Sequence, residues 1–191
     1  WMTVTPNEVE TMRQAVSEAR GRVCAFGLGL GYFALMAALK PEVSSVTVVE
    51  RDPAVIALFQ EHILPQFPDP GKVRLVQADA FAFAGRRMEQ IDYAFVDLWH
   101  DVADGLPLYG RMKRLEHLSP DTRFAYWIER SLLSNLRFRL LNRMQDALEG
   151  REGPEEFPQT AGWRLERYEQ VETALRDDAL RRLAAGWQCR P

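Results

Sequence analysis

Cysteines, long apolar runs and surplus basic charge are all scarce in this chain of 191 residues. Its two cysteines, Cys24 in an apolar stretch and Cys189 near the end, do not favour a structural disulfide. No apolar run is long enough to span a bilayer, and residues 5–13 are too charged for a secretion signal. A net charge of −3 argues against a dedicated nucleic-acid binder, because such proteins are usually basic. We therefore expect a cytoplasmic protein that has no membrane partner.

Signatures of metal chemistry and of protein nucleophiles are also missing. The three histidines, His62, His100 and His117, show no metal-ligand spacing with cysteines or acids. The sequence contains no GxSxG motif and no Cys/His nucleophile pattern. We expect no metal site, and a reaction in which the positioning of the reactants matters more than a reactive side chain.

A glycine-rich turn is the most informative feature that is present. It lies in residues 23–32 and contains Gly27, Gly29 and Gly31; the next apolar run ends in Glu50, nineteen residues after Gly31. Glycines let backbone approach a ligand closely, and a carboxylate at the tip of the second strand can bind both ribose hydroxyls. This order predicts a nucleoside pocket. The alternatives are an ordinary glycine-rich turn and a strand-end acid that faces water.

Apolar strands alternate with helices along the chain, which predicts a parallel, doubly wound, Rossmann-like α/β sheet in the order 3-2-1-4-5. The ligand of such a sheet lies at the carboxyl ends of strands one and four, where the winding direction reverses. Glu50, Asp79 and Asp97 all fall at carboxyl ends of predicted strands. The predicted strands are residues 23–26, 45–50, 72–77, 91–98 and 122–128; the predicted helices are 6–20, 31–39, one from Pro53, 111–118 and 130–148, with 99–110 as an irregular connection.

The end of the chain differs in composition from the rest. Residues 163–185 contain almost no β-branched residues, so we expect helix there and no closing antiparallel hairpin after strand five. We divide the chain into a nucleoside-binding domain, residues 1–149, and a helical extension, residues 150–191, packed on the same domain.

The GxGxG spacing of the turn resembles that of class I S-adenosylmethionine (AdoMet) methyltransferases. Tyr32 stands where the dinucleotide fingerprint has its third glycine, which makes a NAD-dependent oxidoreductase a distant alternative. Within that superfamily, residues 23–109 resemble spermidine synthase-like proteins. The resemblance is carried by Ala25, by residues 46–56 (VTVVERDPAVI), by residues 78–81 (ADAF) and by the run from Asp97 to Tyr109. The chain departs from that subgroup at Asp101, which follows Asp97 by four residues instead of three, and in having no N-terminal β-hairpin region.

The resemblance implies a cofactor and a set of residues that bind it. The ligand is AdoMet, S-adenosylhomocysteine or decarboxylated AdoMet, without a metal. The resemblance also implies that Asp79 accepts a hydrogen bond from the adenine amino group, whereas helix capping is the alternative for this residue. The predicted cofactor-binding residues are Gly27, Leu28, Gly29, Gly31, Glu50, Arg51, Asp79, Ala80 and Asp97.

The segment after strand four carries the residues predicted to meet the acceptor. Asp97 and Asp101 are the predicted catalytic residues, because carboxylates orient a nucleophile and accept its proton. With Asp104 they form an acidic mouth that attracts cations. The alternatives are an ordinary solvated loop for the acids and loop packing for the aromatic residues. The predicted substrate-binding residues are Trp99, His100 and Tyr109.

These observations predict an AdoMet-dependent methyltransferase with a small-molecule acceptor. One alternative is a spermidine synthase-like aminopropyltransferase, in which Asp97 and Asp101 bind and deprotonate an amine. The other is a non-catalytic nucleoside-binding module, which the helical extension favours. Acids at the mouth repel a polyphosphate, so a nucleic acid is not the expected acceptor. The sequence leaves a homo-oligomer open.

Overall fold

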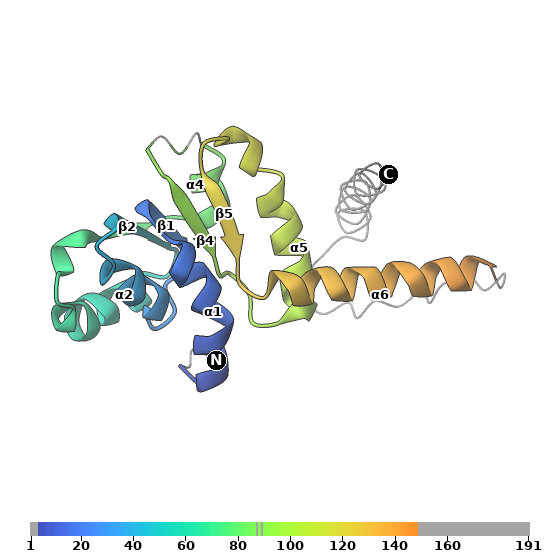
Figure 1. Cartoon of the computed structure of the whole chain (residues 1–191), viewed down its shortest axis with the longest axis horizontal. Helices are drawn as coiled ribbons and strands as arrows, with labels where there is room; N and C mark the ends of the chain where they lie inside the picture. The colour runs from blue at the N-terminus through green and yellow to red at the C-terminus, as the bar shows by residue number, and fades with distance from the viewer. Residues whose placement is uncertain (1–3, 87, 89, 149–191) are drawn as a thin grey trace, which may run out of the picture.

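Five parallel strands form the sheet in the predicted order β3-β2-β1-β4-β5 (Figure 1). The structure is a computed structural model that describes residues 4–86, 88 and 90–148. β1 pairs with β2 on one side and with β4 on the other, so the winding direction reverses between them. The predicted Rossmann-like α/β fold is therefore confirmed. The strands are β1 (Gly21–Phe26), β2 (Val43–Glu50), β3 (Val73–Gln77), β4 (Tyr93–Val96) and β5 (Arg123–Tyr126).

Helices cover both faces of the sheet because its strands send apolar side chains in both directions. In β4, Tyr93 and Phe95 join one buried cluster, whereas Ala94 and Val96 join the other. The first cluster includes residues of α1 (Pro6–Glu18), α2 (Tyr32–Ala38) and the π-helical turn Phe59–Ile63, which continues α3 (Pro53–Leu58). The second cluster includes residues of α4 (Ala80–Ala84), α5 (Val102–Lys113) and α6 (Glu129–Leu148). Short 3-10 turns lie at Leu64–Gln66, Pro70–Lys72 and Glu116–Leu118.

Both ends of α1 are fixed by hydrogen bonds. At its start, the Glu8 N–H donates to Thr5 Oγ1 (3.3 Å) and the Thr5 N–H donates to Glu8 Oε2 (2.8 Å), which forms a capping box. At its end, the Lys40 ammonium donates to three carbonyl oxygens at 2.7–2.8 Å, where the helix macrodipole is negative. Because α1 ends beside the start of β1, its first turns lie toward the carboxyl edge of the sheet.

The predicted irregular connection, residues 99–110, is wrong, because most of it belongs to α5. Gly105 and Pro107 are poor helix formers and lower the helix prediction. The helix nevertheless begins directly after Asp101, whose side chain caps it. A Cβ at Gly105 would lie 2.8 Å from the Trp99 ring, so the missing side chain lets α5 pack closely on the indole. The predicted helix 111–118 is divided between the end of α5 and the 3-10 turn Glu116–Leu118.

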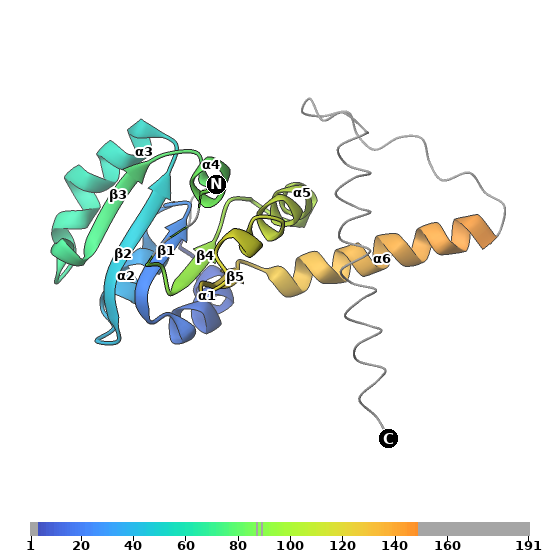
Figure 2. The ribbon, with the colours of Figure 1, turned by 90° about the horizontal axis from the view of Figure 1, so that it is seen from above.

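The last described helix, α6, agrees with the prediction for residues 130–148 to within one residue. Leu132 and Leu136 in its first turns are buried, whereas Phe138 and Leu141 are 63% and 64% exposed. Only the start of α6 therefore packs on the sheet, and the rest projects away from it (Figure 2). No helix among residues 4–148, apart from positions 87 and 89, is long and apolar enough to cross a membrane. The predicted extension, residues 150–191, and the predicted absence of a closing hairpin there lie outside the described residues.

Candidate nucleoside-binding site

The glycine-rich turn follows β1 and crosses the end of β4. Gly27, Gly29 and Gly31 all have positive φ, at 92°, 52° and 79°. A Cβ at Gly27 would collide with the carbonyl oxygen of Asp97, so a side chain is excluded where the turn passes β4. A Cβ at Gly29 would meet no atom within 4 Å, so the turn is open on that side. Bare backbone thus borders open space at the reversal point of the sheet, where a ligand is expected.

Glu50, at the tip of β2, is held against this turn. The Leu28 N–H donates to Glu50 Oε2 at 3.1 Å. The N–H groups of Arg51 and Asp52 donate to Oε1 at 2.8 and 2.9 Å. An ionised carboxylate has about four lone-pair positions, so these three bonds leave acceptor capacity for a hydroxyl group. The structure therefore brings together the turn and the acid that the sequence pattern paired.

Asp79 and Ala80 lie where β3 passes into α4. Asp79 Oδ1 accepts a hydrogen bond from the Ala82 N–H at 2.8 Å, so the side chain caps this helix. The Asp79 side chain is exposed, and Ala80 is buried. The capping role is therefore present, and a contact between Asp79 and adenine stays a prediction.

Asp97 directly follows β4 and has unusual surroundings. Within the described part of the chain, no N–H or O–H group donates to its carboxylate. Burial, followed by the negative charge of Glu8 in α1, raises the pKa of Asp97 to about 7. The carboxyl group is therefore poised near neutrality, as expected for a group that accepts and releases protons.

The other two acids of the predicted mouth have hydrogen-bond partners around the start of α5. Asp101 Oδ1 accepts from the N–H groups of Ala103 and Asp104, and the Asp101 N–H donates to Asp104 Oδ1, which completes the capping box of α5. Asp104 Oδ2 lies 2.8 Å from His100 Nδ1, and Asp104 also accepts from the His100 N–H. Asp101 thus has a structural role, and its predicted catalytic role stays a prediction.

The structure places Trp99 and Tyr109 in the core, and their predicted substrate contacts stay a prediction. These residues are only 6% and 2% exposed, and both belong to the cluster under α5 and α6. The Tyr109 hydroxyl donates to Glu129 Oε1 at 2.7 Å, and the Trp99 ring stacks on Tyr126. Both aromatic residues therefore help to build the core. His100, by contrast, is exposed beside Asp104.

A residue that sequence reasoning missed is Trp127, at the end of β5. Tyr126 pairs with Val96, and the Trp127 N–H donates to the Val96 carbonyl at 2.9 Å, which places Trp127 beside Asp97. Trp127 is partly buried, and its indole Nε1 donates to Thr11 of α1 at 2.9 Å. The sequence feature that could have indicated Trp127 is its place directly after β5, because residues that follow parallel strands lie at the same edge of the sheet.

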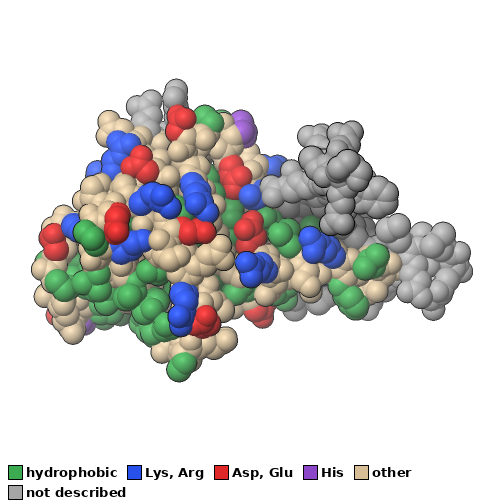
Figure 3. All heavy atoms as spheres, in the orientation of Figure 1, with side chains coloured by type: hydrophobic (Ala, Val, Ile, Leu, Met, Phe, Trp, Pro, Cys, Tyr) green, Lys and Arg blue, Asp and Glu red, His purple; other side chains and the backbone are tan. Residues whose placement is uncertain are grey.

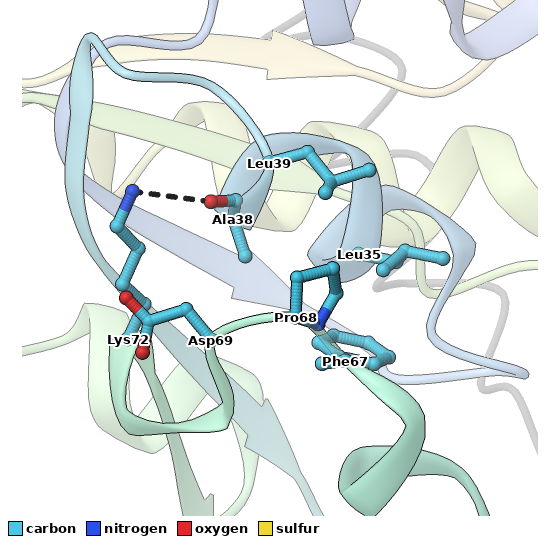
Figure 4. A pocket seen from close by; sticks show the side chains of 7 residues that line it. All are labelled: Leu35, Ala38, Leu39, Phe67, Pro68, Asp69 and Lys72. Atoms are coloured by element: carbon cyan, nitrogen blue, oxygen red, sulfur yellow. Dashed lines mark hydrogen bonds between the residues drawn. The ribbon is translucent and has the colours of Figure 1, made fainter.

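Two surface hollows lie at the opposite, amino edge of the sheet. One of about 170 Å³ is lined by Phe67, Lys72 and the end of α2, where the Lys72 ammonium donates to the Ala38 carbonyl at 3.2 Å (Figure 4). The other, of about 310 Å³, lies around Arg22 and Asp92. Neither includes the turn or Asp97. Among the described residues, no group of three or more His, Cys, Asp or Glu is placed to hold a metal ion.

No family model and no curated protein matches the chain. Solved structures with a similar chain path include TrmN from Thermus thermophilus, with 23% identity and a TM-score of 0.49 over 69% of this chain and 41% of that one. A putative O-methyltransferase from Klebsiella pneumoniae has 20% identity and a TM-score of 0.45 over 61% and 52% of the two chains. Spermidine synthase from Thermotoga maritima has 15% identity and a TM-score of 0.42 over 57% and 37%.

This chain therefore spans less than half the length of TrmN and of the spermidine synthase. Because all three TM-scores are below 0.5, these similarities do not establish an activity for this chain. The narrower resemblance to spermidine synthase-like proteins stays a prediction. Evidence for a function therefore comes from the geometry of the turn, Glu50 and Asp97.

Proposed function

We propose that this protein is an AdoMet-dependent methyltransferase that acts on a small-molecule acceptor. The observation that carries the proposal is the hydrogen bond from the Leu28 N–H to Glu50, which joins the glycine turn to the acid at the tip of β2. The turn is open at Gly29, so its backbone is accessible to a ligand. The residues present therefore fit the cofactor.

On the cofactor side, each residue has a separate task. Glu50 binds a ribose hydroxyl with the acceptor capacity that its backbone partners leave on Oε2. The turn, from Gly27 to Gly31, would hold the methionine portion, and Asp79 and Ala80 would border the adenine. Asp97 and Glu50 follow or end the strands on either side of β1. Bound AdoMet would supply an activated methyl group to the acceptor's lone pair and would leave as S-adenosylhomocysteine.

On the acceptor side, Asp97 orients the nucleophile and takes its proton. Its pKa of about 7 makes it a stronger base than an ordinary carboxylate while leaving a large ionised fraction at neutral pH. On the face of the described residues drawn in Figure 3, Lys and Arg alternate with Asp and Glu. This mixed charge fits a small acceptor better than a polyanion.

The capping role of Asp101 bears on the aminopropyltransferase alternative. That reaction was predicted to use Asp97 and Asp101 together on an amine. Since Asp101 Oδ1 already accepts two backbone N–H groups, no observation favours a second free base next to Asp97. Methyl transfer remains the function that this geometry supports best.

Calorimetry tests the cofactor assignment directly. AdoMet and S-adenosylhomocysteine are titrated into wild type and into Glu50→Ala, with methylthioadenosine, decarboxylated AdoMet and NAD as competitors. Glu50→Ala should weaken binding by about 2 kcal/mol, or roughly 30-fold, because a charge-assisted hydrogen-bonding group is lost.

The matched control is Glu42→Ala, which removes an exposed acid just before the other end of β2. This variant should bind both ligands as wild type does. Thermal unfolding of both variants separates loss of the site from loss of the fold. Equal affinity of wild type and a folded Glu50→Ala variant would refute the assignment.

A further inference from the structure

Asp97 and Trp127 occupy equivalent positions on neighbouring strands. β4 and β5 pair in parallel from Tyr93 with Arg123 to Val96 with Tyr126, and the next hydrogen bond, from the Trp127 N–H to Val96, continues the ladder. Residues opposite each other in a parallel ladder point to the same face. Asp97 and Trp127 therefore both face the layer that contains α1.

The first turns of α1 reach the same place. The Trp127 indole donates through Nε1 to Thr11 Oγ1 at 2.9 Å, and the Thr11 hydroxyl donates to the Glu8 carbonyl at 2.7 Å. After burial, the negative charge of Glu8 is the second cause that raises the pKa of Asp97. Asp97, the Trp127 indole and the first turns of α1, which carry Glu8, thus lie toward the same edge of the sheet.

The backbone after Trp127 is held in an uncommon conformation. Ile128 has φ of 48°, a value that is rare for a β-branched residue. Its carbonyl accepts from the N–H groups of Ser131 and Leu132, so α6 starts there and fixes the chain. With the indole tied to Thr11 at one end and the backbone held at the other, the orientation of Trp127 is well determined.

We propose that Trp127, held by Thr11, forms the wall of the acceptor subsite beside Asp97 and selects a small organic cation. The proposal rests on the function proposed above and names the acceptor class. An indole face attracts a cation, and the Asp97 carboxylate together with the negative charge of Glu8 favours positive over neutral guests. Trp99 and Tyr109, which the sequence had assigned to this wall, lie in the core on the other face of the sheet.

Benzylamine and benzyl alcohol are suitable probes, since they share a ring and differ in charge at neutral pH. Their binding is measured by calorimetry in the presence of saturating S-adenosylhomocysteine. Wild type should bind benzylamine at least tenfold more tightly than benzyl alcohol. Trp127→Ala should lose at least tenfold in benzylamine affinity, whereas Thr11→Val and Trp127→Phe, which remove the anchoring hydrogen bond and keep a ring face, should each lose only a few-fold.

The control is Phe138→Ala, which removes an exposed aromatic residue of α6 and should change nothing. A second measurement separates binding from a purely structural effect. NMR titration of the side-chain carboxyl carbons should show that benzylamine lowers the pKa of Asp97 in wild type and not in Trp127→Ala. Equal affinity for the two probes, Trp127-dependent binding of an RNA oligonucleotide in their place, or benzylamine affinity insensitive to Trp127→Ala would each overturn the inference.

These failures differ from a failure of the proposed function. If S-adenosylhomocysteine does not bind wild type, the cofactor assignment is wrong. If it binds wild type and Trp127→Ala equally while benzylamine binding is insensitive to the substitution, only the acceptor wall is wrong.

Discussion

β4 is bordered by an aspartate at each end, and the two carboxylates differ in their hydrogen bonding and in the direction of their pKa shifts. At the amino end, Asp92 accepts from the Arg22 backbone N–H at 2.7 Å and from two guanidinium nitrogens at 2.9 Å. These bonds lower the pKa of Asp92 to about 2. At the carboxyl end, no donor among the described residues reaches Asp97, whose pKa burial raises to about 7.

The difference extends to the whole of each edge. At the amino edge, Lys40 and Lys72 donate to the last carbonyls of α1 and α2, and Arg22 neutralises Asp92. At the carboxyl edge, Asp97 has no donor within residues 4–86, 88 and 90–148, and the backbone at Gly29 borders open space. A buried polar group without a partner costs stability, so its retention is expected where a ligand supplies the partner. We therefore propose that the amino edge serves stability and the carboxyl edge serves binding.

The largest effect is expected from closing the turn at the carboxyl edge. Gly27→Ala places a methyl group against the Asp97 carbonyl at a backbone with φ of 92°, and no side-chain movement relieves that contact. We expect a loss of about 2–4 kcal/mol in the free energy of unfolding and loss of S-adenosylhomocysteine binding. Urea unfolding and calorimetry measure the two effects.

Gly29→Ala is the matched control for that substitution. Its φ of 52° lies in the ordinary left-handed region, and its Cβ meets nothing within 4 Å. It should cost only about 1 kcal/mol of stability. If both variants lost the same stability, the turn would not be pressed against β4 as described.

An intermediate effect is expected from Asp97→Asn, and it should depend on pH. Because the pKa of Asp97 is raised in the folded protein, the wild type is destabilised progressively as pH rises from about 4 to about 7. The asparagine variant should therefore equal wild type near pH 4 and be more stable by on the order of 2 kcal/mol at pH 8. Denaturant unfolding at several pH values measures the difference. A less stable variant at pH 8 would mean that Asp97 has a stabilising partner.

The features of the two edges that depend on residues close together in the chain could be predicted from the sequence. The turn and Glu50 are separated by one helix, and the strand order follows from the alternation of strands and helices. Asp97 was placed correctly because it ends an apolar run. The neighbourhood of Asp97 and Trp127 was missed because it depends on which strands pair and in which register, and thirty residues separate the two.

The burial of two aromatic residues was missed for a related reason. Trp99 and Tyr109 follow β4 in the sequence, and proximity in the chain placed them at the mouth. The capping box at Asp101 starts α5 immediately, and Gly105 lets that helix close over Trp99, so both rings turn into the core. Local composition, with glycine and proline in the segment, argued for a loop and concealed this packing.

The smallest effect is expected at the amino edge, from Asp92→Asn. The pKa of Asp92 is lowered in the folded protein, chiefly by the Arg22 side chain, so the carboxylate stabilises the fold above about pH 4 and this contribution is lost as pH falls to about 2. The Asp92 and Arg22 side chains are both 43% exposed, so solvent screening limits the loss for Asp92→Asn to about 1 kcal/mol at pH 7. The loss should vanish near pH 2, the opposite trend to Asp97→Asn, and S-adenosylhomocysteine affinity should be unchanged. A change in that affinity would show that the two edges of the sheet do not have separate roles.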